Sequence, residues 1–263
     1  MQNNQLVVVV PVFRDHFSDS EILSLRQLYK HKNKYKIISI TPNDLPQKSD
    51  FDQNIQFNNR YFVGTSSYSK LLLSKEFYTH FLDYEYILIY QLDCIILSDD
   101  LKSWCELGYD YIGAPLFWNK NKPENGFSRV GNGGLSLRKV NTFLKVLNSQ
   151  HVPNWYQILK NPLPDRSQFD IRKRISVYRE MQRGAKWYAN QYSLNEDLFW
   201  SDRAKYFYPN FKIAPVNVGL QFAFEAHPRY CYEKNNKNLP FGAHAWEKWG
   251  RKFWEKQMKE LSN

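Results

Sequence analysis

The sequence predicts an α/β protein built on a parallel sheet. Residues 6–12 form a continuous apolar, largely β-branched run, which is typical of a strand buried on both faces. A helical segment follows, and a second apolar run at residues 35–41 completes a strand–helix–strand unit. A unit of this length places its two strands parallel with a right-handed crossover. We expect one domain over residues 1–263, with a less regular C-terminal half.

The first helix is predicted after Ser18, because Ser18 and Glu21 have the spacing of a capping box. Ile22, Leu25 and Leu28 then recur at helical intervals. Residues 153–190 are rich in Pro and Arg, and we expect them to form an insertion or lid. We expect further helices at residues 66–84, 140–147 and 246–261, and further strands at residues 55–57, 85–97, 110–117 and 213–224.

The composition limits the class of protein. Hydrophobic residues make up 43% of the 263 residues and charged residues 24%, which are values of a globular chain rather than a disordered one. An excess of 36 Lys and Arg over 26 Asp and Glu predicts an anionic partner, such as nucleic acid, anionic lipid or a phosphate-bearing small molecule. Three cysteines without CxxC spacing fit a reducing compartment and argue against a structural zinc site. The chain has neither an 18-residue apolar run nor a recognisable secretory signal.

Asp93 interrupts the most apolar segment of the chain, residues 85–97. A carboxylate is costly to bury without a partner, and ligands of open α/β sheets bind at the carboxyl ends of strands. An acid at that edge can hold a divalent cation that neutralises a diphosphate. The alternative is a carboxylate that caps the turn after the strand.

Three glycines surround Asn132 in the segment VGNGGLSLR, residues 130–138. Glycines let a backbone approach a ligand closely. The segment is not GxGxxG and lacks the lysine of a P-loop, so it predicts neither of those phosphate-binding motifs. The alternative is a tight turn without a ligand.

Two further segments contain candidate catalytic or metal-binding residues. Glu196 and Asp197 begin a predicted short helix, where one of them could act as a general base, although acids also suit the dipole of a first helical turn. His244 follows a Pro/Gly turn and stands between small residues, so its imidazole is accessible to a transition metal. The alternative for His244 is a structural role.

In this order, the segments resemble a bacterial family of GT-A-like glycosyltransferases that is catalogued mainly as a domain of unknown function. The resemblance implies a GT-A-like, Rossmann-related fold with a mixed, mostly parallel central sheet flanked by helices. It also implies a nucleotide-binding half at about residues 1–120 and an acceptor-side half at about residues 121–263. The matching segments are YILIYQLDCIIL, DYIGAPLF, VGNGGLSLR, NEDLFW and PFGAHAW.

The resemblance implies a role for each acid and for the histidine. Asp93 corresponds to the metal ligand of a DxD motif, with Gln91 in place of the first acid, and His244 completes a site for Mn²⁺ or Mg²⁺. Asp197 corresponds to the catalytic base of inverting members, and Glu196 would orient the acceptor or the base.

The remaining implied contacts are with a nucleotide-sugar donor, for which a UDP-sugar is expected. Lys70 corresponds to a basic position that reaches the diphosphate or the sugar, and Asn132 would bind sugar hydroxyls. Gly133 and Gly134 would pass beside the donor sugar. The residues expected at the nucleobase are Pro11, Val12, Phe13 and Arg14.

The implied reaction is transfer of a sugar to a hydroxyl of a glycan or lipid-linked glycan acceptor in bacterial capsule or lipopolysaccharide synthesis. The Trp- and Lys-rich tail at residues 246–261 fits peripheral contact with an anionic membrane at its cytoplasmic face, or packing of the tail on the domain. We therefore expect a cytoplasmic protein. The alternatives are a catalytically inactive carbohydrate- or nucleotide-binding paralogue and a nucleic-acid-binding protein that uses residues 166–186. No nucleic acid is expected as a partner, because no known nucleic-acid-binding motif is present.

Overall fold

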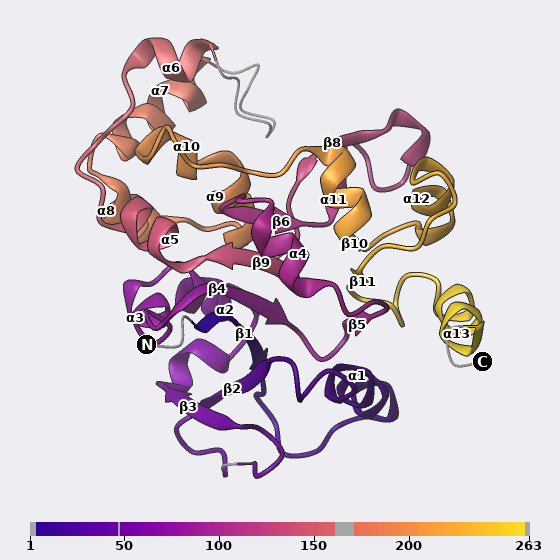
Figure 1. The fold of residues 1–263 in the computed structure, drawn as a ribbon. Coiled ribbons are helices and arrows are strands. Elements are labelled where there is room, and N and C mark those ends of the chain that lie inside the picture. The colour runs from indigo at the N-terminus through magenta and orange to yellow at the C-terminus, as the bar shows by residue number, and fades with distance from the viewer. Residues whose placement is uncertain (1–3, 47, 161–170, 261–263) are drawn as a thin grey trace.

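A computed structural model of the chain describes residues 4–46, 48–160 and 171–260. Its centre is a six-stranded sheet with the order β3-β2-β1-β4-β9-β6 (Figure 1). Strands β1 to β4 pair in parallel, whereas β9 pairs antiparallel with both β4 and β6. This confirms the mixed, mostly parallel sheet flanked by helices. The strands are β1 (Asn4–Pro11), β2 (Lys36–Pro42), β3 (Gln53–Phe57), β4 (Tyr84–Tyr90), β6 (Tyr111–Gly113) and β9 (Leu135–Lys139).

The N-terminal half follows the predicted strand–helix–strand pattern. Val7 and Val10 of β1 have no exposed surface, as expected of a strand covered on both faces. Helix α1 (Asp19–Tyr29) begins with the predicted capping box, in which the Ser18 hydroxyl accepts from the Glu21 N–H and the Glu21 carboxylate accepts from the Ser18 N–H. Figure 1 shows α1 on one side of β1, with α2 and α3 on the other.

Three segments that the sequence presents as single elements are divided in the structure. Residues 66–84 contain two helices, α2 (Thr65–Leu72) and α3 (Lys75–Thr79), after the short 3₁₀ helix η1 (Asn59–Phe62). The division occurs at Ser74, whose hydroxyl accepts from the Phe77 N–H and caps a new helix. The single long helix predicted there is therefore wrong.

The apolar segments at residues 85–97 and 110–117 are also divided. The first leaves the central sheet after Tyr90 and continues as β5 (Ile95–Ile96) in a small sheet with β11 (Gly242–Ala243) and β10 (Ala223–Phe224). The second supplies β6 and then β7 (Pro115–Phe117), which pairs with β8 (Phe127–Val130) across the 3₁₀ helix η2 (Pro123–Asn125).

Most of the C-terminal half is helical. The strand predicted at residues 213–224 is wrong, because Val216–Phe222 form helix α11. The last two residues of the segment then form β10. A short apolar run does not distinguish a buried helix from a strand. The other helices are α4 (Leu101–Glu106), α5 (Val140–Leu147), α6 (Trp155–Lys160), α7 (Ile171–Met181), α8 (Ala185–Gln191), α9 (Glu196–Asp202), α10 (Ala204–Phe207), α12 (Pro228–Lys234) and α13 (Arg251–Glu260).

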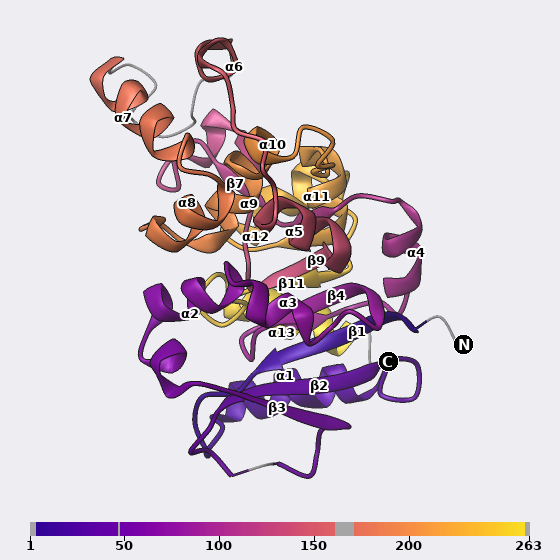
Figure 2. The same ribbon diagram turned by 90° about the vertical axis from the view of Figure 1, so that its left-hand side faces the viewer.

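The described residues of the two basic segments of the chain, residues 166–186 and the tail at residues 246–261, lie in different parts of the structure. Figure 2 shows α6 and α7 at one end of the molecule, away from the central sheet. Residues 166–170 of the basic stretch lie outside the described residues. In the tail, Trp246 and Trp254 are buried against the body of the protein. Among the described helices, none has the length and apolar character needed to cross a membrane.

Candidate active site

The candidate site forms where β4 ends. Tyr90 of β4 pairs with Leu135 of β9, so the turn before β9 lies beside the residues that follow β4. The N–H of Gln91 donates to the carbonyl of Gly134 at 2.9 Å, which joins these two segments directly. Topology therefore brings the glycine-rich turn, residues 131–134, to the carboxyl end of a parallel strand, where α/β proteins bind ligands.

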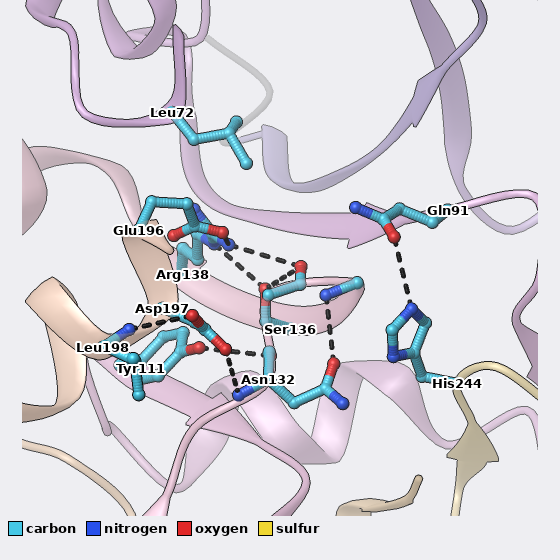
Figure 3. A network of polar contacts seen from close by, with 12 residues as sticks. Leu72, Gln91, Tyr111, Asn132, Ser136, Arg138, Glu196, Asp197, Leu198 and His244 are labelled. Carbon is cyan, nitrogen blue, oxygen red and sulfur yellow. Dashed lines mark hydrogen bonds and ion pairs between the residues drawn. The ribbon is translucent and has the colours of Figure 1, made fainter. Parts of the chain in front are cut away.

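The small sheet delivers His244 to the same place. Ala243 pairs with Ile95, so the residue after β11 lies beside the residues before β5. The His244 Nε2 atom lies 3.4 Å from Asp93 Oδ1 and 3.2 Å from Gln91 Oε1 (Figure 3 draws the second contact). The structure thus brings together three predicted site residues that are up to 153 positions apart in the sequence.

Asp93 and His244 shift each other's pKa in opposite directions. Burial opposes ionisation of both groups, but their mutual contact outweighs it, so the pKa of Asp93 is lowered and the pKa of His244 is raised. The Lys248 ammonium further lowers the pKa of Asp93. An ionised carboxylate at this edge is therefore stable and available to a cation.

The donor atoms fit a divalent metal. Asp93, Cys94 and His244 offer ligand atoms that all lie within 4.8 Å of one another. Burial raises the pKa of the Cys94 thiol well above its ordinary value, and its Sγ donates to the Gly134 carbonyl, so it is a poor ligand at neutral pH. The carboxylate of Asp93, the imidazole of His244 and the amide oxygen of Gln91 form a mixed oxygen–nitrogen set, which suits Mn²⁺ better than Mg²⁺.

The glycines of the turn are required by close packing. A Cβ atom at Gly134 would overlap the His244 imidazole, and one at Gly133 would overlap the Glu196 carboxylate. Asn132 adopts a left-handed conformation with φ of 64°, and its side-chain oxygen accepts from the Gly134 N–H at 3.1 Å. The turn is therefore in close contact with His244 and Glu196. The Asn132 amide oxygen stabilises the turn through its hydrogen bond to Gly134.

Asp197 lies in the first turn of α9 and is held by backbone groups. Its Oδ2 accepts from the Asn132 N–H at 3.1 Å and its Oδ1 accepts from the Leu198 N–H at 2.9 Å (Figure 3). Burial raises the pKa of Asp197, although both hydrogen bonds oppose the shift. A carboxylate fixed in this way and with a raised pKa has the properties of a general base.

Glu196 points into the protein and pairs with Arg138 of β9. Glu196 Oε1 lies 2.9 Å from the Arg138 guanidinium, which also donates to the Tyr78 hydroxyl at 3.1 Å and to Ser136 Oγ at 3.0 Å. Burial raises the pKa of Glu196 to about 7, and Arg138 opposes this shift. Because both side chains are buried, this pair connects α9 to the central sheet beside Asp197 (Figure 3).

Two cavities open at this edge of the protein. The Asp93 cavity has a volume of about 540 Å³, and the Trp118 cavity, which contains Asp197, has a volume of about 280 Å³. The Asp93 cavity is lined by Pro11, Phe13, Phe62, Tyr68, Gln91 and Asp93, among others. The Trp118 cavity is lined by Trp118, Lys120, Ser128, Arg129, Asp197 and Leu198, among others.

The predicted nucleobase residues divide into two groups. Pro11 and Phe13 line the Asp93 cavity, and Phe13 is 53% exposed. Val12 is fully buried in the core and does not reach the cavity. Arg14 does not line it either, but its guanidinium pairs at 2.6 Å with Glu21, which does.

Lys70 does not reach the cavity. Its ammonium donates at 2.6 Å to the carbonyls of Asn190 and Tyr192, at the C-terminal end of α8. Carbonyls without partners at a helix end attract a cation, and this explains the position of the side chain. Lys248, in addition to His244, is close enough to lower the pKa of Asp93.

Sequence reasoning missed several residues at the site. Arg138 carried a signal, because an arginine inside the strand LSLRK must find a buried partner. Tyr68 lies in the segment predicted as a helix, Phe62 lies where no element was predicted, and Trp118 was not singled out among eight tryptophans. Nothing in the local pattern indicates that these side chains meet at cavities.

Among known proteins, no curated protein matches the sequence of this chain. The galactosyltransferase LgtC, solved in complex with donor and acceptor sugar analogs, has 12% identity and a TM-score of 0.49, with coverage of 97% of this chain and 96% of that chain. A glycosyltransferase involved in the glycosylation of the major capsid of PBCV-1 has 9% identity and a TM-score of 0.45, with coverage of 98% of this chain and 100% of that chain.

A family profile covers the candidate site almost completely. It matches residues 52–244, which is more than half of the chain and extends from β3 to His244. The expectation of a family catalogued as a domain of unknown function is therefore confirmed. The chain belongs to the family described as "Protein of unknown function (DUF5672)".

Proposed function

We propose that this chain is a glycosyltransferase that moves a sugar from a nucleotide-diphosphate donor to a hydroxyl group. The observation that carries the proposal is the convergence of Asp93, His244, the glycine-rich turn and Asp197 at the carboxyl edge of the central sheet. These are the motifs on which the resemblance to GT-A glycosyltransferases rests. Such a convergence of distant segments supports a shared site rather than separate structural roles.

The Asp93 cavity is the proposed donor site. Phe13 and Phe62 offer apolar surface to a nucleobase, and Asp93, His244 and Gln91 are the residues that would hold Mn²⁺. When bound there, a divalent cation stabilises the negative charge that grows on a departing diphosphate. We favour a UDP-sugar as donor, as the resemblance implies.

Asp197 is the proposed base. In the proposed reaction it accepts the proton of the acceptor hydroxyl while that oxygen forms a bond to the anomeric carbon. The bond between the anomeric carbon and the diphosphate oxygen breaks, and the nucleoside diphosphate leaves with the electron pair. Attack opposite the leaving group inverts the configuration.

The two cavities support a division of labour along the chain. The donor cavity is lined by residues 11–93, and the cavity that contains Asp197 is lined by residues 116–198. This supports a nucleotide-binding N-terminal half and an acceptor-side C-terminal half. A bacterial surface glycan or lipid-linked glycan as acceptor, and peripheral contact of the basic tail with an anionic membrane, stay predictions.

A panel of nucleotide sugars, screened by thermal shift with and without Mn²⁺, tests the proposal. One donor should raise the Tm, since a ligand that binds the folded state stabilises it. The shift should disappear in Asp93→Ala and His244→Ala but not in His151→Ala, which removes an exposed histidine elsewhere. No shift with any donor would sink the proposal, and binding without transfer or hydrolysis would favour an inactive binding paralogue. Activity that survives EDTA would remove the metal from the scheme.

A further inference from the structure

Trp118 differs from every other tryptophan of the chain. All eight tryptophans lie within the described residues, and seven of them are buried or half-buried, whereas Trp118 is 60% exposed. Single exposed apolar side chains are common, but Trp118 combines the highest exposure of any tryptophan in the chain with a place in the lining of a cavity. The ring is not on a loose loop, because the Trp118 N–H donates to the Gly126 carbonyl at 3.2 Å and closes the β7–β8 hairpin.

The exposed ring shares a cavity with the proposed base. Trp118 and Asp197 both line the Trp118 cavity, whose volume of about 280 Å³ has room for a single sugar ring. Ser128 and Asn195 add polar groups to the same wall. An apolar plate with polar groups at its edge matches a pyranose, which has an apolar face of C–H groups and a rim of hydroxyls.

The charges around the Trp118 cavity disfavour an anionic ligand. The Arg129 guanidinium pairs with Asp202 at 2.5 Å, and the Lys120 ammonium lies 3.6 Å from Glu225. Both cations of the lining are therefore compensated by acids, and Asp197 adds a further carboxylate. A uronate or phosphate at this place would meet net repulsion.

We infer that the Trp118 cavity is the acceptor subsite and that it binds a neutral pyranose stacked on Trp118. The inference rests on the proposed function and deepens it, since it specifies the ring that presents its hydroxyl to Asp197. In this arrangement Trp118 contacts the acceptor and not the donor. Removing the indole should therefore weaken acceptor binding selectively.

The kinetic test compares three variants. Trp118→Ala should raise the KM for a neutral methyl pyranoside acceptor about tenfold or more, while the donor KM and the rate of donor hydrolysis stay at wild-type values. Trp118→Phe, which keeps an aromatic face, should recover most of the loss. Leu107→Ala, which trims an exposed side chain that lines neither cavity, should change none of these values. A change in acceptor KM of less than twofold in Trp118→Ala, or an equal change in donor KM, would overturn the inference.

A binding measurement separates this inference from the proposed function. Trp118 is the most exposed of the eight tryptophans, so neutral methyl pyranosides should reduce acrylamide quenching of the wild-type protein and should not do so in Trp118→Phe. Lack of protection by any of them, or stronger protection by a methyl glucuronide or by lipid vesicles, overturns the inference even if nucleotide sugars still raise the Tm. Protection without any nucleotide-sugar binding would instead leave a sugar site and overturn its assignment to an acceptor.

Discussion

The two cavities use their carboxylates in opposite ways. Asp93 is half-exposed and faces an imidazole, and this contact lowers its pKa. Asp197 is largely enclosed, faces backbone N–H groups and a buried environment, and has a raised pKa. Environments that push two carboxylates apart in pKa assign them different tasks. One is suited to staying ionised against a cation, and the other to accepting a proton.

The glycine-rich turn makes these two environments possible at neighbouring positions. Gly134 lies against His244, on the Asp93 side, and Gly133 lies against Glu196, on the Asp197 side. Asn132, between Gly131 and Gly133, donates its N–H to Asp197. A single turn thus contacts Asp197 directly and the Asp93 side through His244, and the absence of side chains at Gly133 and Gly134 lets the Glu196 carboxylate and the imidazole approach.

The largest expected effect comes from Asp197→Asn. The amide has the same shape and cannot accept the proton, so kcat for transfer should fall by about 10²–10⁴-fold, the usual contribution of a general base. The Tm shift produced by the nucleotide sugar should stay as in the wild type, because Asp197 does not line the Asp93 cavity. Steady-state kinetics and thermal shift on the same preparation measure both quantities.

The matched control is Asp99→Asn, which removes an exposed carboxylate paired with Lys34 on the surface. Its kcat should equal that of the wild type. If Asp197→Asn also retains the wild-type kcat, the two cavities do not divide binding from proton transfer, and a retaining route without this base becomes the better description.

The next largest effect is a loss of stability, which should appear on the Asp197 side of the site and not on the Asp93 side. Glu196→Ala leaves the Arg138 guanidinium buried without its carboxylate, which should lower the free energy of unfolding by about 3–5 kcal/mol. Asp93→Ala removes a half-exposed group and should change stability much less. Urea unfolding followed by circular dichroism measures both variants.

The control for this comparison is Glu255→Ala, which breaks an exposed ion pair with Arg251 and should leave unfolding almost unchanged. A small effect of Glu196→Ala, comparable with that of Glu255→Ala, would show that the buried pair does not support the Asp197 side. In that case the fixed position of Asp197 would depend on its backbone hydrogen bonds alone.

The sequence predicted the parallel half of the fold better than the helical half. Strand β1 and helix α1 were predictable because a long β-branched run and a capping box are local signals. Helix α11 was not, since its apolar run of 213–224 has no period that separates helix from strand at that length. The pairing of β9 with β4 was also missed, because antiparallel insertion into a parallel sheet is a tertiary property.

The site residues likewise divide into those that a local sequence signal predicts and those whose place depends on tertiary structure. Asp93 and the Glu196–Asp197 pair stood out because each places a charge next to an apolar segment. Lys70 shows what sequence patterns leave out: helix-end carbonyls compete for its ammonium, and no sequence pattern ranks them against a ligand. Trp118 was overlooked because exposure is set by the three-dimensional arrangement of β7 and β8 and not by its neighbours in the chain.

The smallest expected effect is a shift in the acid limb of the pH profile. A base works only when deprotonated, so a raised pKa of Asp197 means that kcat declines on acidification at a pH above the ordinary aspartate value of 3.8. Protonation of His244, whose pKa is also raised, would produce a similar limb by displacing the metal. The two origins differ in their response to Mn²⁺: a limb from His244 moves to lower pH as Mn²⁺ increases, because metal and proton compete, whereas a limb from Asp197 does not move. We expect a limb that is independent of Mn²⁺ at saturating donor, and a limb that follows the metal concentration would assign the pH dependence to the Asp93 side instead.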